Sequence, residues 1–233
     1  MVKMLRFFVT VLAGLMVSLA GYSQARVQLI HNSPDTANRY VDVWIGSSKV
    51  FNNLEFRTST SFVDVPAGNQ ISIVLTDSSS TNPANPLAIY RRTFESGHKY
   101  ILVINGMVDP TGYNPYFELG ITAFDLAREQ ASNPSKTDLL FLQGVTDLPE
   151  VDVVEANLGL ISNNQNYLDF DGYFGFNPAD LILFVKDNAS QSTLYSYELP
   201  LVSLGLQGQA GVVVMSGFVD PATNSLGKPF GMF

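Results

Sequence analysis

The sequence contains no cysteine. This excludes a disulfide framework, a thiolate nucleophile and a cysteine-based zinc site. Histidine is nearly absent too, with only His31 and His98, which leaves little material for a transition-metal site or a catalytic triad. No stretch after the first 25 residues is long and apolar enough to cross a membrane, so we expect no membrane span in the mature chain.

Basic residues are scarce as well. The chain has 13 Lys and Arg residues against 21 Asp and Glu residues, and Arg91-Arg92 is its one basic pair. Two of the basic residues, Lys3 and Arg6, lie within the first 25 positions, so the rest carries 11 basic against 21 acidic residues, a formal charge of −10. Nucleic acids and anionic membranes bind clustered Lys and Arg, so the charge balance argues against nucleic acid as a partner.

The N-terminal segment has the three-part plan of a secretory signal peptide. A basic start is followed by an uncharged run over residues 7–20 and by a small-residue exit, Ser23-Gln24-Ala25. The uncharged run is shorter than the roughly 20 apolar residues of a membrane span. We predict cleavage after Ala25, with Ala20 as the alternative, and a secreted, cell-surface or periplasmic protein.

Strand signals dominate the remaining chain. Residues 41–45 and 71–75 are alternating or β-branched, and turn residues such as Asn32-Ser33-Pro34-Asp35 and Val65-Pro66-Ala67-Gly68 separate such runs. Strands at intervals of about 8–12 residues predict sandwiches or barrels. We therefore predict an all-β chain of immunoglobulin-like antiparallel β-sandwiches, with one short helix over residues 124–130.

Three segments recur in the same order, 110 to 114 residues further on. This spacing predicts two copies of one domain in tandem. The predicted division is a signal peptide at 1–25, a first domain at 26–126, a polar linker at 127–137 and a second domain at 138–233. The recurring segments are Val41-Asp42-Val43 with Val151-Asp152-Val153, Leu54-Glu55-Phe56 with Leu168-Asp169-Phe170, and residues 105–110 with 216–221.

The first copy resembles a known family. Residues 25–35, then Val41-Asp42-Val43 and the turn at 65–68, are similar to the opening of DUF4397 domains. These are domains of unknown function, common in exported bacterial proteins and often in tandem, including in Bacteroidetes. The resemblance implies no activity, and it covers the second copy only in outline, where Gln143 stands in place of His31.

The resemblance also bears on the end of the chain. Some relatives end in a type IX secretion sorting domain. The sequence stops at Phe233, immediately after residues 228–230, the counterpart of 114–116. It therefore either lacks that domain or has been cut short.

His31 has two readings. It ends a predicted strand ahead of Asp35, so it is either a general base or ligand with that carboxylate, or a strand-end residue whose ring hydrogen-bonds the following turn. Gln143 at the matching position keeps hydrogen bonding but cannot carry proton chemistry. The second reading is therefore favoured, and no catalytic residue is assigned.

Acidic residues at strand ends are weak candidates for Ca²⁺, a cation that binds several oxygens. No Asp-x-Asp-x-Asp-Gly loop is present, and Asp before Pro or Ser also closes turns. We therefore assign no cofactor and keep Ca²⁺ as a minor alternative. The candidates are Asp35, Asp77, Asp109, Asp147, Asp187 and Asp220.

Aromatic residues on predicted strands indicate stacking surfaces for a ligand. If Val41 and Val43 face the core, Trp44 faces outward with Tyr40, and Tyr195 and Tyr197 share one face of their strand. The sequence thus favours a non-enzymatic, exported binding or structural module for adhesion, matrix organisation or capture of a glycan or surface protein. The alternatives are a secreted glycosidase-like hydrolase with paired carboxylates and an architectural spacer.

Overall fold

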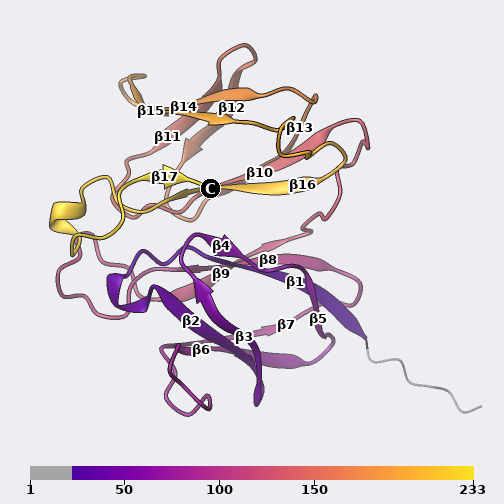
Figure 1. Ribbon diagram of the computed structural model, residues 1–233, viewed down its shortest axis with the longest axis vertical. Coiled ribbons are helices and arrows are strands. Elements are labelled where there is room, and N and C mark those ends of the chain that lie inside the picture. Colours follow the sequence, from indigo (N-terminus) through magenta and orange to yellow (C-terminus); the bar gives the residue numbers. More distant parts are fainter. Residues whose placement is uncertain (1–22) are drawn as a thin grey trace, which may run out of the picture.

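The computed structural model describes residues 23–233, so the predicted signal peptide lies outside the described residues except for its last three positions (Figure 1). The described chain is built from strands, and its helical content is limited to two 3-10 turns, Thr36–Asn38 and Pro221–Thr223. The all-β sandwich prediction is confirmed. The helix expected over residues 124–130 is wrong, because strand β9 runs to Asp125 and Leu126 then adopts a left-handed φ of 62°.

The strands fall into two consecutive groups. The first group is β1 (Gln24–His31), β2 (Tyr40–Ile45), β3 (Ser48–Glu55), β4 (Thr58–Ser59), β5 (Val63–Pro66), β6 (Gln70–Asp77), β7 (Ala88–Thr93), β8 (Lys99–Asn105) and β9 (Gly120–Asp125). The second group is β10 (Thr137–Gln143), β11 (Val151–Glu155), β12 (Gly159–Gln165), β13 (Phe170–Phe176), β14 (Leu181–Asp187), β15 (Thr193–Leu199), β16 (Ala210–Ser216) and β17 (Gly231–Met232).

Each group forms two sheets, and the strand order of the two groups matches. The first half has the orders β4-β1-β8-β9, with β5 also paired to β1, and β3-β2-β6-β7. The second half has β13-β10-β16-β17 and β12-β11-β14-β15. Pairing is antiparallel except between β1 and β8 and between β10 and β16, which are parallel. We call strands and residues at the same place in the two halves counterparts.

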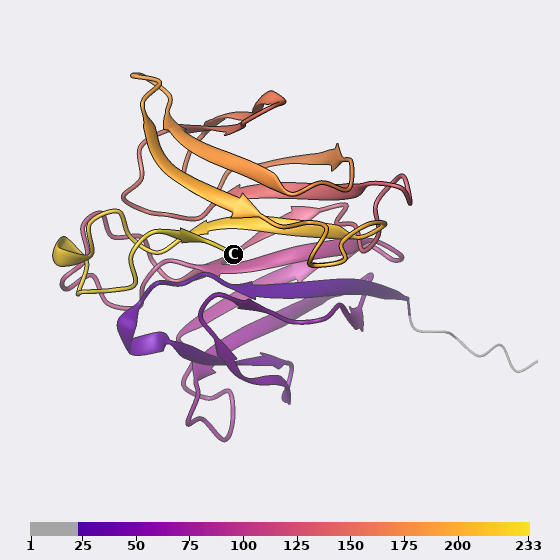
Figure 2. The same ribbon diagram turned by 45° about the horizontal axis from the view of Figure 1, so that its top comes forward.

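The four sheets stack as four layers (Figures 1 and 2). The two β2- and β11-containing sheets are the outer layers, and the β1- and β10-containing sheets face each other in the middle of the molecule. Ile30, Ile101, Leu140, Leu142 and Val214 form the shared core between these middle sheets. Strands covered on both faces need apolar residues at consecutive positions, which explains the uninterrupted runs 101–104 and 139–142.

Each sandwich also has its own core. Val41 and Val43 in the first half and Val151 and Val153 in the second are fully buried between their two sheets. The intervening Asp42 and Asp152 point to the opposite, outer face, as the alternation of a strand requires. Each of these aspartates accepts the backbone N–H of an asparagine in a left-handed conformation, Asn53 (2.8 Å) and Asn164 (3.0 Å), where the neighbouring strand bulges.

One of the three sequence repeats does not correspond in space. Leu54 pairs with Val41, and its counterpart opposite Val151 is Gln165, not Leu168. The structural counterpart of Leu168 is Arg57: both have left-handed backbones, and both donate their N–H to the last residue of the first strand. The match between residues 54–56 and 168–170 is therefore a coincidence of side chains that lies three residues out of register.

The third repeat, residues 105–110 and 216–221, contains a glycine that lies against the backbone of another segment. Gly106 and Gly217 have φ angles of 81° and 89° and follow counterpart strands β8 and β16. A Cβ atom on Gly106 would lie 2.3 Å from the Glu118 carbonyl oxygen, and one on Gly217 would lie 2.4 Å from the Pro229 carbonyl oxygen. Only glycine fits at these positions, because the returning chain passes directly against the backbone.

Candidate functional site

The His31 ring is buried and tied to its own turn. The side chain is fully buried, its Nε2 lies 3.0 Å from the Asn38 carbonyl oxygen, and the Ser33 N–H donates to Nδ1 at 3.3 Å. Burial lowers the pKa of His31 to about 4, although the bond to Asn38 acts in the opposite direction. A neutral ring that donates through Nε2 and accepts through Nδ1 fits the turn-closing reading of His31.

Gln143 performs half of the same task in the second half. Its Oε1 accepts the Val145 N–H at 2.5 Å, as Nδ1 of His31 accepts the Ser33 N–H. The second half has no 3-10 turn to match Thr36–Asn38, and the Gln143 amide nitrogen has no partner within residues 23–233. The Gln143 amide thus keeps the bond that Nδ1 of His31 accepts, but it has no equivalent of the bond between Nε2 and the Asn38 carbonyl.

Two of the six calcium candidates fasten loops together. The Asp35 carboxylate, 4% exposed, accepts bonds from Ala37 and Val108 N–H groups, the Asn38 amide and the Tyr113 hydroxyl, all at 2.9–3.1 Å. Asp147 accepts the N–H groups of Val219 and Asp220 and the amide of Asn224. Asp35 therefore holds the loop that follows β8, and Asp147 holds the loop that follows the counterpart strand, β16.

The other four candidates close their own turns. Asp77 and Asp187 accept the N–H and hydroxyl of Ser79 and Ser190, and these bonds hold the pKa of both carboxyls below the usual range. Asp109 and Asp220 accept a backbone N–H two residues on. Across residues 23–233, no group of three or more histidine or acidic side chains is gathered that could hold a metal ion.

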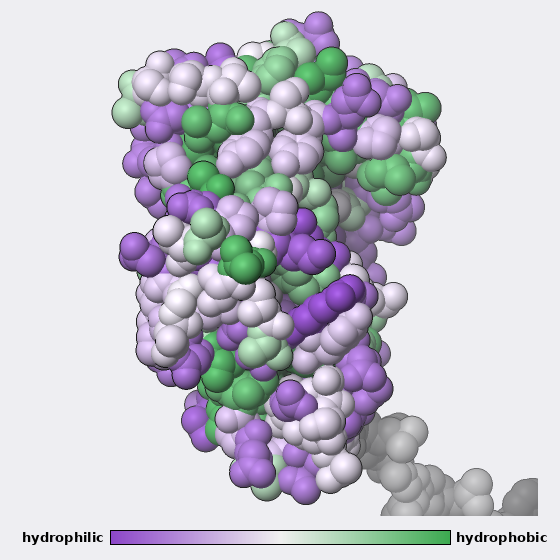
Figure 3. Space-filling model, turned by 60° about the vertical axis from the view of Figure 1, so that its left-hand side comes forward, coloured by the Kyte–Doolittle hydropathy of each residue, from purple (hydrophilic) through white to green (hydrophobic). Residues whose placement is uncertain are grey.

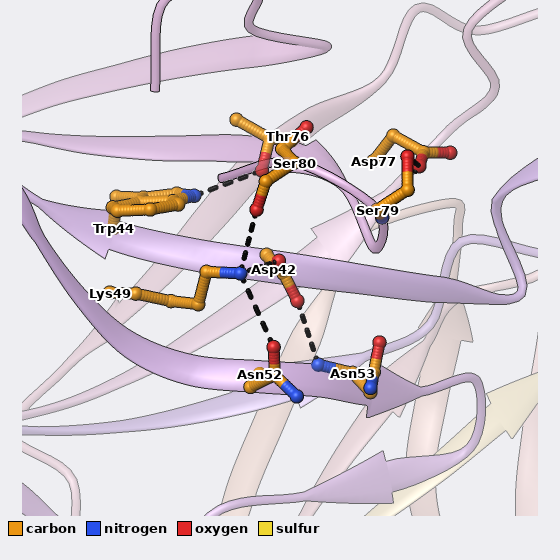
Figure 4. A network of polar contacts seen from close by, with 9 residues as sticks. All are labelled: Asp42, Trp44, Lys49, Asn52, Asn53, Thr76, Asp77, Ser79 and Ser80. Atoms are coloured by element: carbon orange, nitrogen blue, oxygen red, sulfur yellow. Dashed lines mark hydrogen bonds and ion pairs between the residues drawn. The ribbon is translucent and has the colours of Figure 1, made fainter. Parts of the chain in front are cut away.

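Trp44 does not face solvent as expected. It lies on the outer face of its sheet beside Asp42, but it is only 5% exposed (Figure 4). Its Nε1 donates to Thr76 at 2.9 Å, and the Lys49 ammonium lies 5.0 Å from the centre of its ring. Lys49 also contacts buried Asp42 and donates to the Ser80 carbonyl at 2.8 Å. The loop after β6 and the lysine therefore cover the tryptophan, which strand alternation alone cannot reveal.

The tyrosines are dispersed. Tyr195 and Tyr197 share one face of β15, as expected, but this face packs against the second core: Tyr195 stacks on Phe230 with centroids 3.9 Å apart, and Tyr197 lies 6.0 Å from the same ring. Tyr40 is 38% exposed and carries the Arg39 guanidinium 5.2 Å from its ring centre. The four aromatic candidates do not form one platform.

The structure instead offers a pocket where the two halves meet. This junction pocket has a volume of about 420 Å³, within the range of small-ligand sites. Its wall from the first half includes Phe56 and Arg39, and its wall from the second half includes Leu226, Lys228 and Pro229. Pro34, Asp35, Thr36 and Gly227 complete the lining.

The two walls are held in place by contacts that cross the junction. The Arg57 guanidinium donates to the Ser216 carbonyl (2.9 Å), the Ser216 hydroxyl (3.1 Å) and the Pro229 carbonyl (2.6 Å). The Asn32 amide donates to the Gly144 carbonyl at 2.8 Å, in a buried position. These bonds fix the relative position of Phe56 and Pro229, so the pocket is preformed.

Three charged side chains line the pocket: Arg39, Lys228 and Asp35. The Arg39 guanidinium donates twice to the Glu55 carboxylate, which holds the pKa of Glu55 below its usual range, and its Nη1 has no hydrogen-bond partner within the described chain. Lys228 is exposed and makes no ion pair among residues 23–233. The acidic side chain of the lining, Asp35, has its oxygens occupied by the four donors described above. The Lys228 ammonium and the Nη1 group of Arg39 are therefore the donors still available to a ligand in the pocket.

The rim contains a strained turn. Ser225 and Leu226 both have left-handed φ angles, 52° and 53°, which non-glycine residues rarely adopt consecutively. This turn holds the Leu226 side chain 81% exposed beside the pocket. Figure 3 views the molecule from the side of these loops, where apolar residues form separate patches among polar ones. Strain of this kind recurs at functional sites, because function rather than stability retains it.

Sequence reasoning missed the junction pocket. Arg39, Phe56 and Lys228 were not among the candidate site residues, and 189 positions separate the two cations in the chain. Two candidates lay nearby: Asp35, which lines the pocket, and Tyr40, which is next to Arg39 in the chain. No pattern in the sequence indicates which loops of two sandwiches will face each other, because this depends on how the halves dock.

The comparisons with known proteins agree with the first-half resemblance. Residues 25–119 match a family model described as a domain of unknown function, DUF4397. No curated protein matches the chain. Among the described residues, no helix is long and apolar enough to cross a membrane.

Some solved structures share a general likeness. A family 41 carbohydrate-binding module from streptococcal virulence factors, studied for alpha-glucan recognition, is 10% identical with a TM-score of 0.26, over 84% of this chain and 95% of that one. A streptococcal virulence factor that binds alpha-glucan is 7% identical with a TM-score of 0.25, over 82% and 92%. A family 26 module of Eubacterium rectale Amy13K, in complex with maltoheptaose, is 10% identical with a TM-score of 0.25, over 90% and 96%. Likenesses this low carry no functional argument.

Proposed function

We propose that this protein is an exported, non-catalytic binding module that captures an acidic glycan in the junction pocket. The observation that carries the proposal is the position of the exposed Lys228 ammonium and the unused Nη1 group of Arg39 beside an apolar wall formed by Phe56 and Pro229. A sugar ring presents apolar C–H groups that pack on such a wall, while a carboxylate on the ring accepts charge-assisted bonds from a guanidinium or ammonium group. The acidic sugar is thus the ligand class that uses both features.

The same geometry supports binding rather than catalysis. A glycosidase requires two carboxyl groups that flank the scissile bond. At the pocket, Asp35 is saturated by donors and Glu55 is paired with Arg39, so neither is presented as an acid or nucleophile. His31 lies fully buried in its own turn. The hydrolase alternative therefore receives no support from this site.

Binding to an array of neutral and carboxylate-bearing oligosaccharides tests the proposal. We expect the purified protein to retain acidic oligosaccharides selectively, and Arg39→Ala and Lys228→Ala each to weaken this binding about tenfold, which is about 1.4 kcal/mol. Arg91→Ala is the matched control, because Arg91 is an exposed arginine on β7, away from the pocket. Equal binding of neutral and acidic glycans, or an equal loss with Arg91→Ala, would refute it.

Export itself has a structural corollary. Gln24 and Ala25 pair with Pro66 and Val65 in the first sandwich, and Ala25 is fully buried. Cleavage after Ala25 would remove these pairs, whereas cleavage after Ala20 would leave β1 whole. We therefore propose Ala20 as the cleavage point, so the exported protein begins at Gly21. Mass spectrometry of secreted material decides between the two, and an N-terminus at Arg26 would contradict this choice.

A further inference from the structure

The two halves meet through the same surface. The shared core contains counterpart residues from both middle sheets, as in an isologous contact between two copies of one patch. A pocket formed by loops of both halves is then expected twice, once on each side of the junction. The counterpart pairs in the shared core are Ile30 with Leu142, Val103 with Val214, and Ile101 with Val212.

The junction pocket does have a counterpart. This second junction pocket has a volume of about 250 Å³, and the two halves exchange roles in its walls. Its wall from the second half contains Tyr167, where the junction pocket has Phe56 from the first half. These two aromatic residues correspond because each immediately precedes one of the left-handed counterparts, Leu168 and Arg57.

The wall from the first half has an aromatic ring in place of a cation. Phe117 is the counterpart of Lys228. Its carbonyl oxygen accepts the Met107 N–H at 2.8 Å, and the Lys228 carbonyl oxygen accepts the Phe218 N–H at 2.9 Å in the same way. Phe117 is 41% exposed, and its ring centre lies 4.5 Å from that of Tyr167. The second junction pocket therefore has an aromatic pair with one ring from each half.

The next residue along the chain is a carboxylate in place of a proline. Glu118 is the counterpart of Pro229, since the carbonyls of both pass directly against the counterpart glycines, Gly106 and Gly217. The Glu118 side chain is exposed and forms no hydrogen bond or ion pair with residues 23–233. It is the one charged side chain in the lining of this pocket. The two pockets thus share a backbone framework but differ in the sign of their available charge.

The Tyr167 ring stays neutral. Burial raises the pKa of its hydroxyl, although a hydrogen bond from the Gly106 backbone acts in the opposite direction. A neutral aromatic ring carries negative charge density on its faces, which attracts cations. The pair of rings and the Glu118 carboxylate therefore favour ligands of the same charge.

Few other polar groups are available in the second junction pocket. The buried Asn105 amide is occupied, because it donates to the Val103 carbonyl at 2.9 Å and accepts the Asn32 amide at 3.1 Å. Only the Thr122 hydroxyl and the Glu118 carboxylate are without hydrogen bonds among the described residues of the lining. A neutral sugar is recognised through several convergent polar groups, which this lining does not supply.

We propose that the second junction pocket binds an organic ammonium group. The rings of Phe117 and Tyr167 attract the charge and contact the carbon atoms that carry the nitrogen. The Glu118 carboxylate neutralises the charge and accepts a charge-assisted hydrogen bond from an ammonium N–H. A neutral group at this place would displace water from Glu118 without compensating its charge, which is unfavourable.

The inference does not depend on the proposed function. The second junction pocket and the junction pocket have no lining residue in common. Loss of ammonium binding should therefore leave any binding of acidic oligosaccharides unchanged, and Arg39→Ala should leave ammonium binding unchanged. Failure of one proposal can thus be distinguished from failure of the other.

Titration of the full chain with glucosamine, followed through the NMR signals of its aromatic side chains, tests the inference. Glucose and N-acetylglucosamine are the matched controls, because they have the same ring without the charge. We expect glucosamine to bind at least about tenfold more tightly than either control. Choline is a second probe, and selective binding of choline alone would support the quaternary form of the same group. Equal binding of glucosamine and glucose, or no binding of glucosamine and choline, would overturn the proposal.

Two variants locate the site. Glu118→Gln keeps the size of the side chain without its charge, and Phe117→Leu keeps an apolar side chain without the ring. Each should weaken ammonium binding about tenfold and leave the melting temperature unchanged. Glu198→Gln is the control, because Glu198 is an exposed glutamate on β15 of the outer layer. Wild-type affinity in Glu118→Gln, or an equal loss in Glu198→Gln, would refute the site.

Discussion

The two outer faces of the molecule differ far more than the backbones beneath them. In the first half, Trp44, Lys49 and Thr76 form a covered polar network around Asp42. Their counterparts by strand register are Val154, Leu160 and Lys186. Leu160 is 57% exposed, and Ile182 on β14 of the same sheet is 43% exposed. Both halves share backbone features such as the bulge held by an aspartate, but they carry different side chains on their outer faces.

The junction shows why the halves also need to differ at one point. Asn32 and Gly144 follow the first strands of the two halves, and they meet each other across the junction. A Cβ on Gly144 would lie 2.1 Å from the Asn32 amide nitrogen. Two identical asparagines could not occupy this place, so one half supplies the side chain and the other supplies the space. Arg57 donates across the junction to Ser216, whereas its counterpart Leu168 lines a hollow together with Phe117 and Glu118 of the first half.

The largest expected effect tests the glycines that the halves share. Gly106→Ala and Gly217→Ala should each destabilise the protein by about 4 kcal/mol or more, because the new Cβ meets a backbone carbonyl that cannot move away. Gly97→Ala is the control: its φ of 76° is similarly left-handed, but the space around it is open, so only about 1 kcal/mol of backbone strain applies. Urea unfolding of the three variants measures the difference, and similar losses for Gly97 and Gly106 would contradict this account.

Acid should distinguish His31 from Gln143. His31 has a pKa of about 4 in the folded state against 6.5 in the unfolded chain, so the unfolded state binds a proton first as the pH falls. Stability contributed by the neutral ring is therefore complete above pH 6.5 and is lost as the pH falls from 6.5 toward 4, by about 3 kcal/mol in total.

His31→Gln tests this difference directly. We expect the variant to be about 1 kcal/mol less stable at pH 7.5, because one hydrogen bond is lost, and to show a shallower decline in acid. Glycan binding should be unchanged at pH 7.5. Melting curves at a series of pH values compare the two proteins, and parallel declines would show that His31 does not titrate as described.

Removal of the shared aspartates should have unequal costs. Asp42→Ala leaves the Lys49 ammonium without its partner and the Asn53 N–H without an acceptor, which should cost about 2–3 kcal/mol. Asp152→Ala loses bonds from the Asn164 N–H and the Gln191 amide, both uncharged, and should cost about 1–2 kcal/mol. Chemical denaturation of both variants measures the costs. Equal values would indicate that the lysine contributes nothing to the first network.

The smallest effect concerns the strained rim. Leu226→Gly should raise stability by up to about 1 kcal/mol, because glycine adopts the left-handed conformation without strain, and it should weaken glycan capture by removing an apolar wall. Leu158→Gly is the control, since Leu158 is an exposed leucine without a left-handed φ, far from the pocket. A loss of stability in Leu226→Gly would contradict this account, because it would mean that the Leu226 side chain makes stabilising contacts.

Much of the backbone could be predicted because it depends on local rules. Alternation predicted Val41 and Val43 in the core, and the repeat placed Val151 and Val153 likewise. The match between residues 105–110 and 216–221 identified segments whose glycines are counterparts. Turn chemistry likewise indicated that acidic residues after strands close turns. Each of these inferences needs only a residue and its near neighbours in the chain.

The features that failed or were missed depend on contacts between distant segments. Trp44 was expected in solvent because alternation names a face of the sheet but does not say what covers that face, and here a loop and Lys49 cover it. Leu168 was matched with Leu54 because their side chains are identical. Its backbone N–H instead bonds Gln143 as that of Arg57 bonds His31, so Arg57 is its counterpart. The sequence by itself determined the strands, the turns and the two cores. Only the tertiary structure decided which sheets meet in the middle, and therefore where Arg39 and Lys228 come together.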